Sequence, residues 1–360
     1  MQTGISVYPG LDNSFEENLR LIHTAAKNGV TRIFTSLHIP ETDTSVFKTE
    51  LGSLLHAARS HNMEIISDIS PKTMELLGFQ QFRLSAFQFL GIHTLRLDNG
   101  YGAAEIAELS RNPQHMRIQL NASTITARIL TELVQNKANF DNIDALHNFY
   151  PREGTGIAEE TLVRKTLLLH KAGVRVGAFI PSQYRRRSPL HRGLPTLEMH
   201  RDFSASLAAR HLAAIGLDSV FIGDSLPSDE ELHALKYLNP EQITIRAKLL
   251  TKDPIQQALL QHTFTSRIDE ARDAIRTQES RTLLQDDIEP ENSKPRAYGA
   301  VTIDNKNYLR YMGELQIIKR PQPADARVNV AARIPEEETF LMNYIIPGKK
   351  FAFEFTNLSN

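Results

Sequence analysis

The sequence contains no cysteine, which excludes disulfides, thiolate metal sites and a cysteine nucleophile. This composition is compatible with a reducing cytoplasm. Tryptophan is also absent, so any stacking on a sugar ring would have to use tyrosine or phenylalanine.

Long apolar runs and an excess of one charge are missing as well. No run approaches the ~20 residues that a membrane-spanning helix needs, and the N-terminal segment lacks the basic and apolar regions of a signal peptide. The 41 Lys and Arg residues and the 42 Asp and Glu residues leave a net charge of -1. We therefore expect a cytoplasmic protein without a membrane or nucleic-acid partner, and the sequence does not indicate an oligomeric state.

The first two-thirds of the chain alternates short apolar runs with longer helical patterns. The runs are rich in Ile, Val, Phe and Leu, which is typical of strands buried on both faces. Eight strands are predicted, at residues 4–8, 32–39, 64–69, 94–98, 117–121, 144–149, 175–180 and 219–223.

Local signals separate these strands from the predicted helices. Ser14 with Glu17, and Ser228 with Glu231, have the spacing of a capping box at a helix start. A glycine stands directly before four of the strands, where it can end the preceding helix in a left-handed conformation.

This alternation predicts an α/β fold, a (β/α)8 TIM barrel over residues 1–238. A doubly wound open sheet is the competing fold, but no GxGxxG turn follows the first strand. Over residues 239–360 the regular alternation of strands and helices stops, and mostly β-like runs follow. This part of the chain is predicted to form a separate small β domain. We expect a helix at 254–261 there and strands at 274–278, 299–303, 308–318, 328–333 and 351–355.

A TIM barrel carries its active site at the C-terminal ends of its strands. The polar residues predicted at those ends are Tyr8, His38, Asp68, Asp98, Asn121, His147, Asn148, Tyr150, Ser182, Gln183 and Asp224. Any one of them could simply cap the next helix, but their convergence on one rim predicts a site.

Asp68 and Asp98 end consecutive predicted strands. Neighbouring strands lie ~4.8 Å apart, so two carboxylates there could flank one substrate bond. An acid that protonates a leaving group and a carboxylate that acts as base or nucleophile are what glycoside hydrolysis requires. Aldolases and isomerases also place carboxylates at this position, so the pair alone does not select the reaction.

The segment after the seventh strand, residues 181–193, contains four arginines and His191. Barrels often bind phosphate near the loops after strands seven and eight, and arginine is the best bidentate partner of phosphate or carboxylate. An anionic substrate is one interpretation, and a solvated surface loop or an interface is the other. Beyond this segment, Thr196 is expected to cap a helix, which would place Glu198 in its first turn.

Metal and cofactor chemistry are poorly supported. The sequence has no HExxH motif, no lysine at a predicted strand end, and no second ligand close to His147. We therefore expect no metal and no cofactor, which leaves carboxylate chemistry on a small anionic molecule.

Several motifs resemble one known family. They are GISVYPG at the start, RLDNG around Asp98, QLNAS at Asn121, HNFYPREGTG from His147, AFIPSQ at Ser182 and PLHRGLPTLEMHR ending at Arg201. Together they are similar to the MupG-type family of bacterial 6-phospho-N-acetylmuramidases, and the resemblance extends over most of the chain.

This resemblance implies a TIM barrel followed by a small cyclophilin-like β barrel. It implies hydrolysis of a phosphorylated amino-sugar, 6-phospho-N-acetylmuramyl-N-acetylglucosamine, to N-acetylmuramic acid 6-phosphate and N-acetylglucosamine in cell-wall recycling. The substrate carries a phosphate and a lactyl carboxylate, which suits the arginine-rich loop.

The resemblance also suggests roles for the matching positions. Asp98 is expected as the leading catalytic carboxylate, with Asp68 or Glu198 as its partner. Arg187 and Arg192 are expected to bind the phosphate or lactyl group. Ser182 and Gln183 would form hydrogen bonds with the substrate, and Tyr8 is expected to bind it as well. The sugar pocket would be shaped by Asn121, His147, Asn148 and Tyr150. The alternatives are another phosphosugar enzyme, such as an isomerase or aldolase, and a non-catalytic carbohydrate-binding or surface protein.

Overall fold

The computed structural model describes residues 1–36, 39, 42–69, 83–97 and 100–355. The chain divides into two compact units, Met1–Leu238 and Asn239–Asn360. Within the described residues, no helix is long and apolar enough to cross a membrane.

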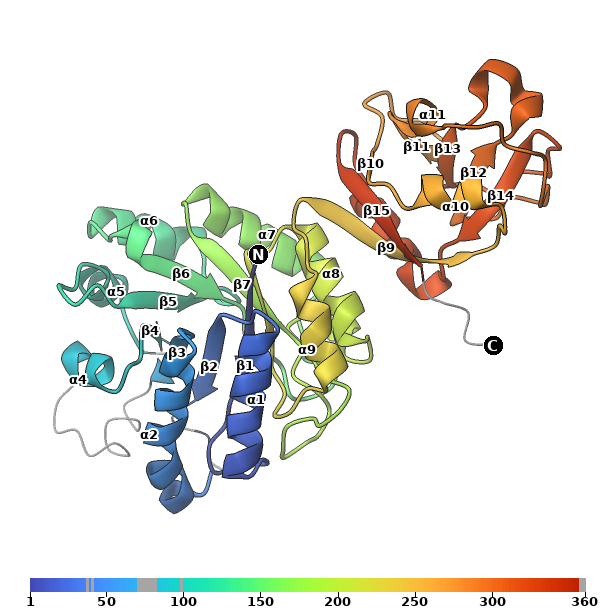
Figure 1. Ribbon diagram of the computed structural model, residues 1–360. Helices are drawn as coiled ribbons and strands as arrows, with labels where there is room; N and C mark the ends of the chain where they lie inside the picture. The colour runs from blue at the N-terminus through green and yellow to red at the C-terminus, as the bar shows by residue number, and fades with distance from the viewer. Residues whose placement is uncertain (37–38, 40–41, 70–82, 98–99, 356–360) are drawn as a thin grey trace. The chain divides into compact units, whose positions relative to one another are not determined.

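The first unit is a closed barrel of parallel strands in the order β1 to β8, which confirms the predicted barrel (Figure 1). Its strands are β1 (Gln2–Ser6), β2 (Arg32–Ser36), β3 (Glu64–Ile69), β4 (Thr94–Leu97), β5 (Arg117–Asn121), β6 (Ile143–Leu146), β7 (Arg175–Ile180) and β8 (Ser219–Ile222). The α-helices between and after them are α1 (Phe15–Lys27), α2 (Thr44–Ser60), α4 (Leu84–Phe89), α5 (Ala103–Ser110), α6 (Ala127–Gln135), α7 (Glu159–Lys171), α8 (Ala205–Ile215) and α9 (Asp229–Lys236).

The predicted helix starts are present. Ser14 and Ser228 both form capping boxes, in which the serine side chain and the glutamate three residues later satisfy each other's backbone N–H groups. Helix α8 ends at Gly216, whose φ of 97° lies in the left-handed region that glycine tolerates.

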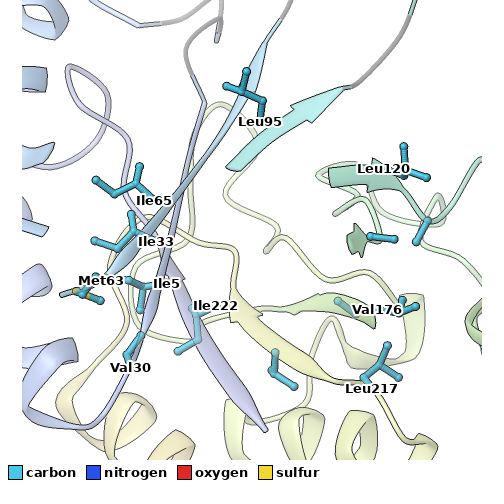
Figure 2. Close-up of a cluster of buried hydrophobic side chains, with 14 of the residues drawn as sticks. Ile5, Val30, Ile33, Met63, Ile65, Leu95, Leu120, Val176, Leu217 and Ile222 are labelled. Carbon is cyan, nitrogen blue, oxygen red and sulfur yellow. The ribbon is translucent and has the colours of Figure 1, made fainter. Parts of the chain in front are cut away.

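Alternation along each strand divides the barrel into an outer and an inner layer. Outward side chains such as Ile5, Ile33, Ile65 and Ile222 form one apolar cluster with the surrounding helices (Figure 2). The strand register runs without interruption around the ring, so the alternate residues of each strand face the interior.

Charged side chains fill the interior at the N-terminal end of the barrel. The buried Arg32 of β2 donates to Glu64 of β3 at 2.9 Å and to Asp144 of β6 at 2.8 Å. Gln119 donates to the other oxygen of Asp144 at 3.0 Å, and Thr94 donates to Glu64 at 2.6 Å. Arg32 is thus neutralised at this end, as a buried cation requires.

His147 directly follows β6, and its side chain lies in the outer layer. The fully buried imidazole contacts the Ser123 hydroxyl through Nδ1 at 3.1 Å and the Thr166 hydroxyl of α7 through Nε2 at 3.3 Å. Burial, with a smaller contribution from Arg96, lowers the pKa of His147 to about 3. The ring is therefore neutral at physiological pH and links the barrel wall to α7.

The second unit is a curled seven-stranded sheet in the order β10-β15-β9-β14-β12-β13-β11. Its strands are β9 (Gln242–Leu249), β10 (Phe264–Thr265), β11 (Ala274–Arg276), β12 (Ala300–Asp304), β13 (Leu315–Ile318), β14 (Val328–Arg333) and β15 (Lys350–Phe355). The helix α10 (Pro254–Leu260) lies close to its predicted position, and the helix α11 (Ser280–Leu283) was not predicted. A bridge between Ser266 and Thr277 joins the two edge strands, so the sheet curls almost into a ring.

The prediction of one strand over residues 308–318 is wrong. A 3-10 segment, η3 (Lys306–Tyr311), occupies its first half, and only β13 is extended. Strand β9 was missed, although its burial alternates along QITIRAKL. The likeness of this unit to cyclophilin stays a prediction.

Gly4 offers a test of the packing inside the barrel. A Cβ built on Gly4 would overlap the ring of the buried Phe221. Gly4→Ala should therefore lower the free energy of unfolding by at least about 1–3 kcal/mol, the usual cost of overpacking, in urea titrations. Gly52→Ala is the matched control, because Gly52 lies inside α2 and no atom lies within 4 Å of its Cβ position. This variant should raise the free energy of unfolding by about 1 kcal/mol, since alanine favours the helix over glycine. Equal effects of the two variants would contradict this packing.

His147 should make the stability depend on pH. The unfolded chain binds a proton at His147 near pH 6.5, whereas the folded imidazole does so only at about 3. Stability is therefore lost as the pH falls below about 6.5, by up to about 1.4 kcal/mol per pH unit. His147→Gln keeps partners for Ser123 and Thr166 but removes the titration, so its stability relative to the wild type should improve steadily from pH 7.5 to 5. A constant difference across this range would argue against the neutral buried ring.

Candidate active site

Polar side chains occupy the inward positions at the C-terminal end of the barrel. The register pairs Ser36 of β2 with Asp68 of β3, and Asp68 with Arg96 of β4. Asp68 is half-buried. Of the two carboxylates expected at consecutive strand ends, Asp68 and Asp98, it is the one that the structure describes. Asp98 and His38 lie outside the described residues.

Arg96 extends this polar layer toward β6. Its guanidinium donates to the Leu146 carbonyl at 2.7 Å and to the Oδ1 atom of Asn148. The Oδ1 atom of Asn121 accepts from the Ser123 N–H at 3.0 Å, so this amide closes the turn after β5. Arg96 was not among the predicted site residues, although strand alternation from Thr94 places it at an inward position.

His147 does not join this group, in contrast to the expectation that it shapes the sugar pocket. Alternation sends residue 147 outward and residue 148 inward, so only Asn148 of this pair reaches the interior. The backbone N–H of Asn148 also donates to Ser123 at 3.0 Å, so Ser123 connects the two neighbours.

The arginines of the loop after β7 have different partners. Arg185 pairs with Glu17 at 2.9 Å, and Arg186 lies 3.4 Å from Asp202. Arg192 pairs with Glu153 at 3.1 Å, and both side chains are more than half exposed. These three side chains are therefore held by carboxylates at the protein surface or the loop edge.

Arg187 is the exception, because it is 9% exposed and has no carboxylate of the described residues within ion-pair distance. Its guanidinium carbon lies 5.0 Å from the ring centres of both Tyr8 and Phe149. Its Nε atom donates to the Ser188 carbonyl at 3.3 Å. We call this arrangement of Tyr8, Arg187 and Phe149 the arginine–aromatic cradle.

Tyr8 is fixed within this cradle. Burial raises the pKa of Tyr8 to about 12, so its hydroxyl stays protonated and donates to the Gly223 carbonyl at 2.7 Å. Phe149 packs against Phe34 and Phe179 of the barrel interior at ring-centre distances of 6.1 Å and 5.0 Å. Both rings are therefore held in place before any ligand binds.

Asp224, two residues after the end of β8, holds the backbone of the same loop. Its buried carboxylate accepts N–H groups from Ser182 at 2.8 Å, Arg187 at 3.0 Å and Leu194 at 3.2 Å. Burial raises the pKa of Asp224 to about 6, although the three N–H donors oppose that shift. Asp12 adds a further link, since it accepts from the Ser188 N–H at 3.0 Å and from the Ser225 hydroxyl at 2.5 Å.

Ser182 and Gln183, which were expected to form hydrogen bonds with the substrate, have partners within this scaffold. The Ser182 hydroxyl donates to Glu231 at 2.7 Å. The Gln183 amide donates to the Phe203 carbonyl at 2.7 Å and to the Arg201 carbonyl at 3.2 Å.

Glu198 is saturated with hydrogen bonds. Arg201 donates to both of its oxygens at 2.7 Å, and the N–H groups of Gly154 and Gly156 donate at 2.9 Å and 2.7 Å. The bonds from Arg201, together with those from the two glycines, lower the pKa of Glu198 to about 2. Glu198 is therefore ionised and fully engaged, which favours a role in anchoring the loop over one in proton transfer.

The prediction that Thr196 caps a helix is wrong. Glu198 begins a short 3-10 segment, η2 (Glu198–His200), whose N-cap is Leu197. The Thr196 hydroxyl instead donates to the Asn148 carbonyl at 2.8 Å and accepts from the Phe179 N–H at 2.9 Å. The same interlocked region holds Tyr150, whose carbonyl accepts from Arg201 at 3.0 Å.

The described rim therefore brings together an inward carboxylate, Asp68, a polar pair, Arg96 with Asn148, and a buried cation between two aromatic rings. Carboxylates can transfer protons or attack a sugar carbon, and a preformed guanidinium can bind an anion. Among these described residues, no three His, Asp or Glu side chains gather closely enough to hold a metal ion.

Comparison with solved structures gives similar proteins over nearly the full length, among them the following two. An uncharacterized Bacillus cereus protein is 32% identical, with a TM-score of 0.88, and the match covers 98% of this chain and 99% of that one. A conserved Enterococcus faecalis protein of unknown function is 33% identical, with a TM-score of 0.75, and the match covers 99% of this chain and 97% of that one. No curated protein matches the chain.

Comparison with protein families gives a match for each unit. Residues 3–237 match the N-terminal part of the 6-phospho-N-acetylmuramidase family, and residues 243–354 match its C-terminal part. The two matches span nearly the whole chain, so this protein belongs to the MupG-type 6-phospho-N-acetylmuramidase family.

Proposed function

We propose that the protein is a glycoside hydrolase that cleaves 6-phospho-N-acetylmuramyl-N-acetylglucosamine. The products are N-acetylmuramic acid 6-phosphate and N-acetylglucosamine, and the reaction serves cell-wall recycling in the cytoplasm. Family membership supports the glycosidase chemistry, and the arginine–aromatic cradle supports the anionic substrate.

The observation that carries this proposal is the environment of Arg187. A buried charge is costly unless it is paired, and a desolvated cation–π contact, which contributes about 2 kcal/mol or more, offsets that cost only in part. The contacts of the Arg187 guanidinium are the two rings and the Ser188 carbonyl, and no carboxylate of the described residues lies within ion-pair distance. The phosphate of the substrate would supply the missing charge, at the rim where barrels bind phosphorylated ligands.

The chemistry is assigned to carboxylates at the same rim. Asp98 remains the proposed leading catalytic carboxylate, and Asp68 is its proposed partner because it faces the interior from β3. Arg96 holds Asn148 in the polar layer, where this amide can bind the sugar. Glu198 is assigned to the scaffold because its oxygens already accept four hydrogen bonds.

Removal of the cradle's charge should affect the phosphorylated substrate selectively. Arg187→Gln should lower kcat/KM for the phosphorylated disaccharide by about 10–100-fold, the usual worth of a charge-assisted hydrogen bond. Turnover of the unphosphorylated disaccharide, slow in the wild type, should hardly change. Arg192→Gln should have a much smaller effect, because an exposed ion pair contributes only about 0–1 kcal/mol.

The comparison of substrates also tests the proposal as a whole. Equal turnover of the phosphorylated and unphosphorylated disaccharides by the wild type would contradict phosphate recognition. A requirement for a divalent metal, or covalent trapping by borohydride, would instead indicate an aldolase or isomerase.

The carboxylate assignment predicts a loss of turnover without a loss of fold. Asp98→Asn and Asp68→Asn should each lower kcat by on the order of 10²–10⁴, as removal of an acid or base does, with unchanged thermal stability of the folded chain. Asp141→Asn is the matched control, because Asp141 is exposed just before β6 at the opposite end of the barrel. Wild-type activity in either rim variant would remove that residue from the mechanism.

A further inference from the structure

Asp224 has contacts that the proposed chemistry does not use. It is fully buried, and its three N–H donors come from the beginning, the middle and the end of the loop after β7. The Oδ2 atom accepts from Ser182 and Leu194, and the Oδ1 atom accepts from Arg187. One side chain thus fixes the course of residues 182–194.

The residue before Asp224 fixes the other side of the cradle. The Gly223 carbonyl accepts the Tyr8 hydroxyl at 2.7 Å. A Cβ on Gly223 would lie 2.8 Å from the Leu194 carbonyl, so the loop packs directly against this glycine. Gly223 therefore holds the Tyr8 ring while Asp224 holds the backbone of Arg187.

Asp224 itself is a poor candidate for the reacting carboxylate. Its oxygens are occupied by backbone donors, and none of its surface is exposed. A general acid has to reach the leaving-group oxygen, which this buried carboxylate does not do.

We propose that Asp224 is the positioning residue of the anion subsite, which places the Arg187 guanidinium between Tyr8 and Phe149 by fixing the loop backbone. This inference rests on the proposed function, because it assigns the cradle to the substrate's anionic group. Asp224 acts through Arg187 and touches no substrate atom.

Replacement of Asp224 by asparagine removes one of the two acceptor oxygens that bind the loop backbone. An asparagine side chain offers one acceptor oxygen and an NH2 group, whereas the three N–H groups need acceptors on two oxygens. At least one backbone donor would then face another donor, and the loop would lose its fixed course.

The test compares Asp224→Asn with Asp218→Asn in the full-length protein. Asp218 precedes the same strand at its opposite end and accepts from the Val176 N–H at 2.7 Å, so it is a matched control. Asp224→Asn should raise the Kd for inorganic phosphate and the KM for the phosphorylated disaccharide by about tenfold, with a smaller change in kcat. Asp218→Asn should leave both constants unchanged.

Limited trypsin digestion gives a readout that needs no substrate. The loop contains Arg185, Arg186 and Arg187, so its release should expose bonds that trypsin cleaves. Cleavage after these arginines should be about tenfold faster in Asp224→Asn than in the wild type or Asp218→Asn, since trypsin reports the population of the opened loop.

Other results of these experiments would contradict either the positioning role of Asp224 or the proposed function. Unchanged phosphate binding in Asp224→Asn, an equal loss in Asp218→Asn, or collapse of the whole barrel in Asp224→Asn would overturn the positioning role. A fall in kcat with unchanged KM would also overturn it, because Asp224 would then act in the chemistry. A wild type that binds phosphate through Arg187 but cleaves no disaccharide would contradict the proposed function alone, whereas one that binds no phosphate would overturn this inference.

Discussion

The described part of the rim depends on the ion pair between Glu198 and Arg201. Arg201 donates to both oxygens of Glu198 and also to the carbonyls of Tyr150, Arg152, Arg192 and Gly193. Glu198 in turn accepts from the N–H groups of Gly154 and Gly156. A single pair therefore satisfies backbone groups from the loops after β6 and β7, which would otherwise have to be solvated or left unpaired.

Each end of the barrel contains a buried arginine, and the two arginines differ in whether a carboxylate neutralises their charge. Arg32, at the N-terminal end, is 3% exposed and contacts both Glu64 and Asp144. Arg187, at the C-terminal end, is 9% exposed and contacts aromatic rings. The first charge is neutralised inside the protein and serves the fold, whereas the second is held in place with its counter-charge missing among the described residues. This asymmetry follows the general division of a TIM barrel into a stabilising face and a reactive face.

The sequence predicted the elements of the barrel well, because each depends on local signals. Strands that are buried on both faces need continuous apolar runs, which are visible in the sequence. The helix starts at Ser14 and Ser228 are visible too, because a capping box depends on residues within one helical turn. The cradle could not be predicted in this way, since Tyr8, Phe149 and Arg187 are far apart in the sequence and meet only through barrel closure. The alternation of side chains along β6 would have predicted that His147 faces outward and Asn148 inward, because successive residues of a strand face opposite sides of the barrel wall.

Two of the motifs that resemble the family, HNFYPREGTG and GLPTLEMHR, have a structural explanation that differs from a catalytic one. HNFYPREGTG supplies Phe149 and the glycine N–H groups, and GLPTLEMHR supplies Glu198 and Arg201, which bind those N–H groups and the neighbouring carbonyls. The second motif therefore binds the backbone of the first, and the Tyr150 N–H of the first donates to the Pro195 carbonyl of the second at 2.9 Å. The carboxylates proposed for the chemistry, Asp68 and Asp98, belong to other segments of the chain. Similarity in these two long motifs thus reports a common scaffold of the loops after β6 and β7, which is independent of the carboxylates proposed for the reaction.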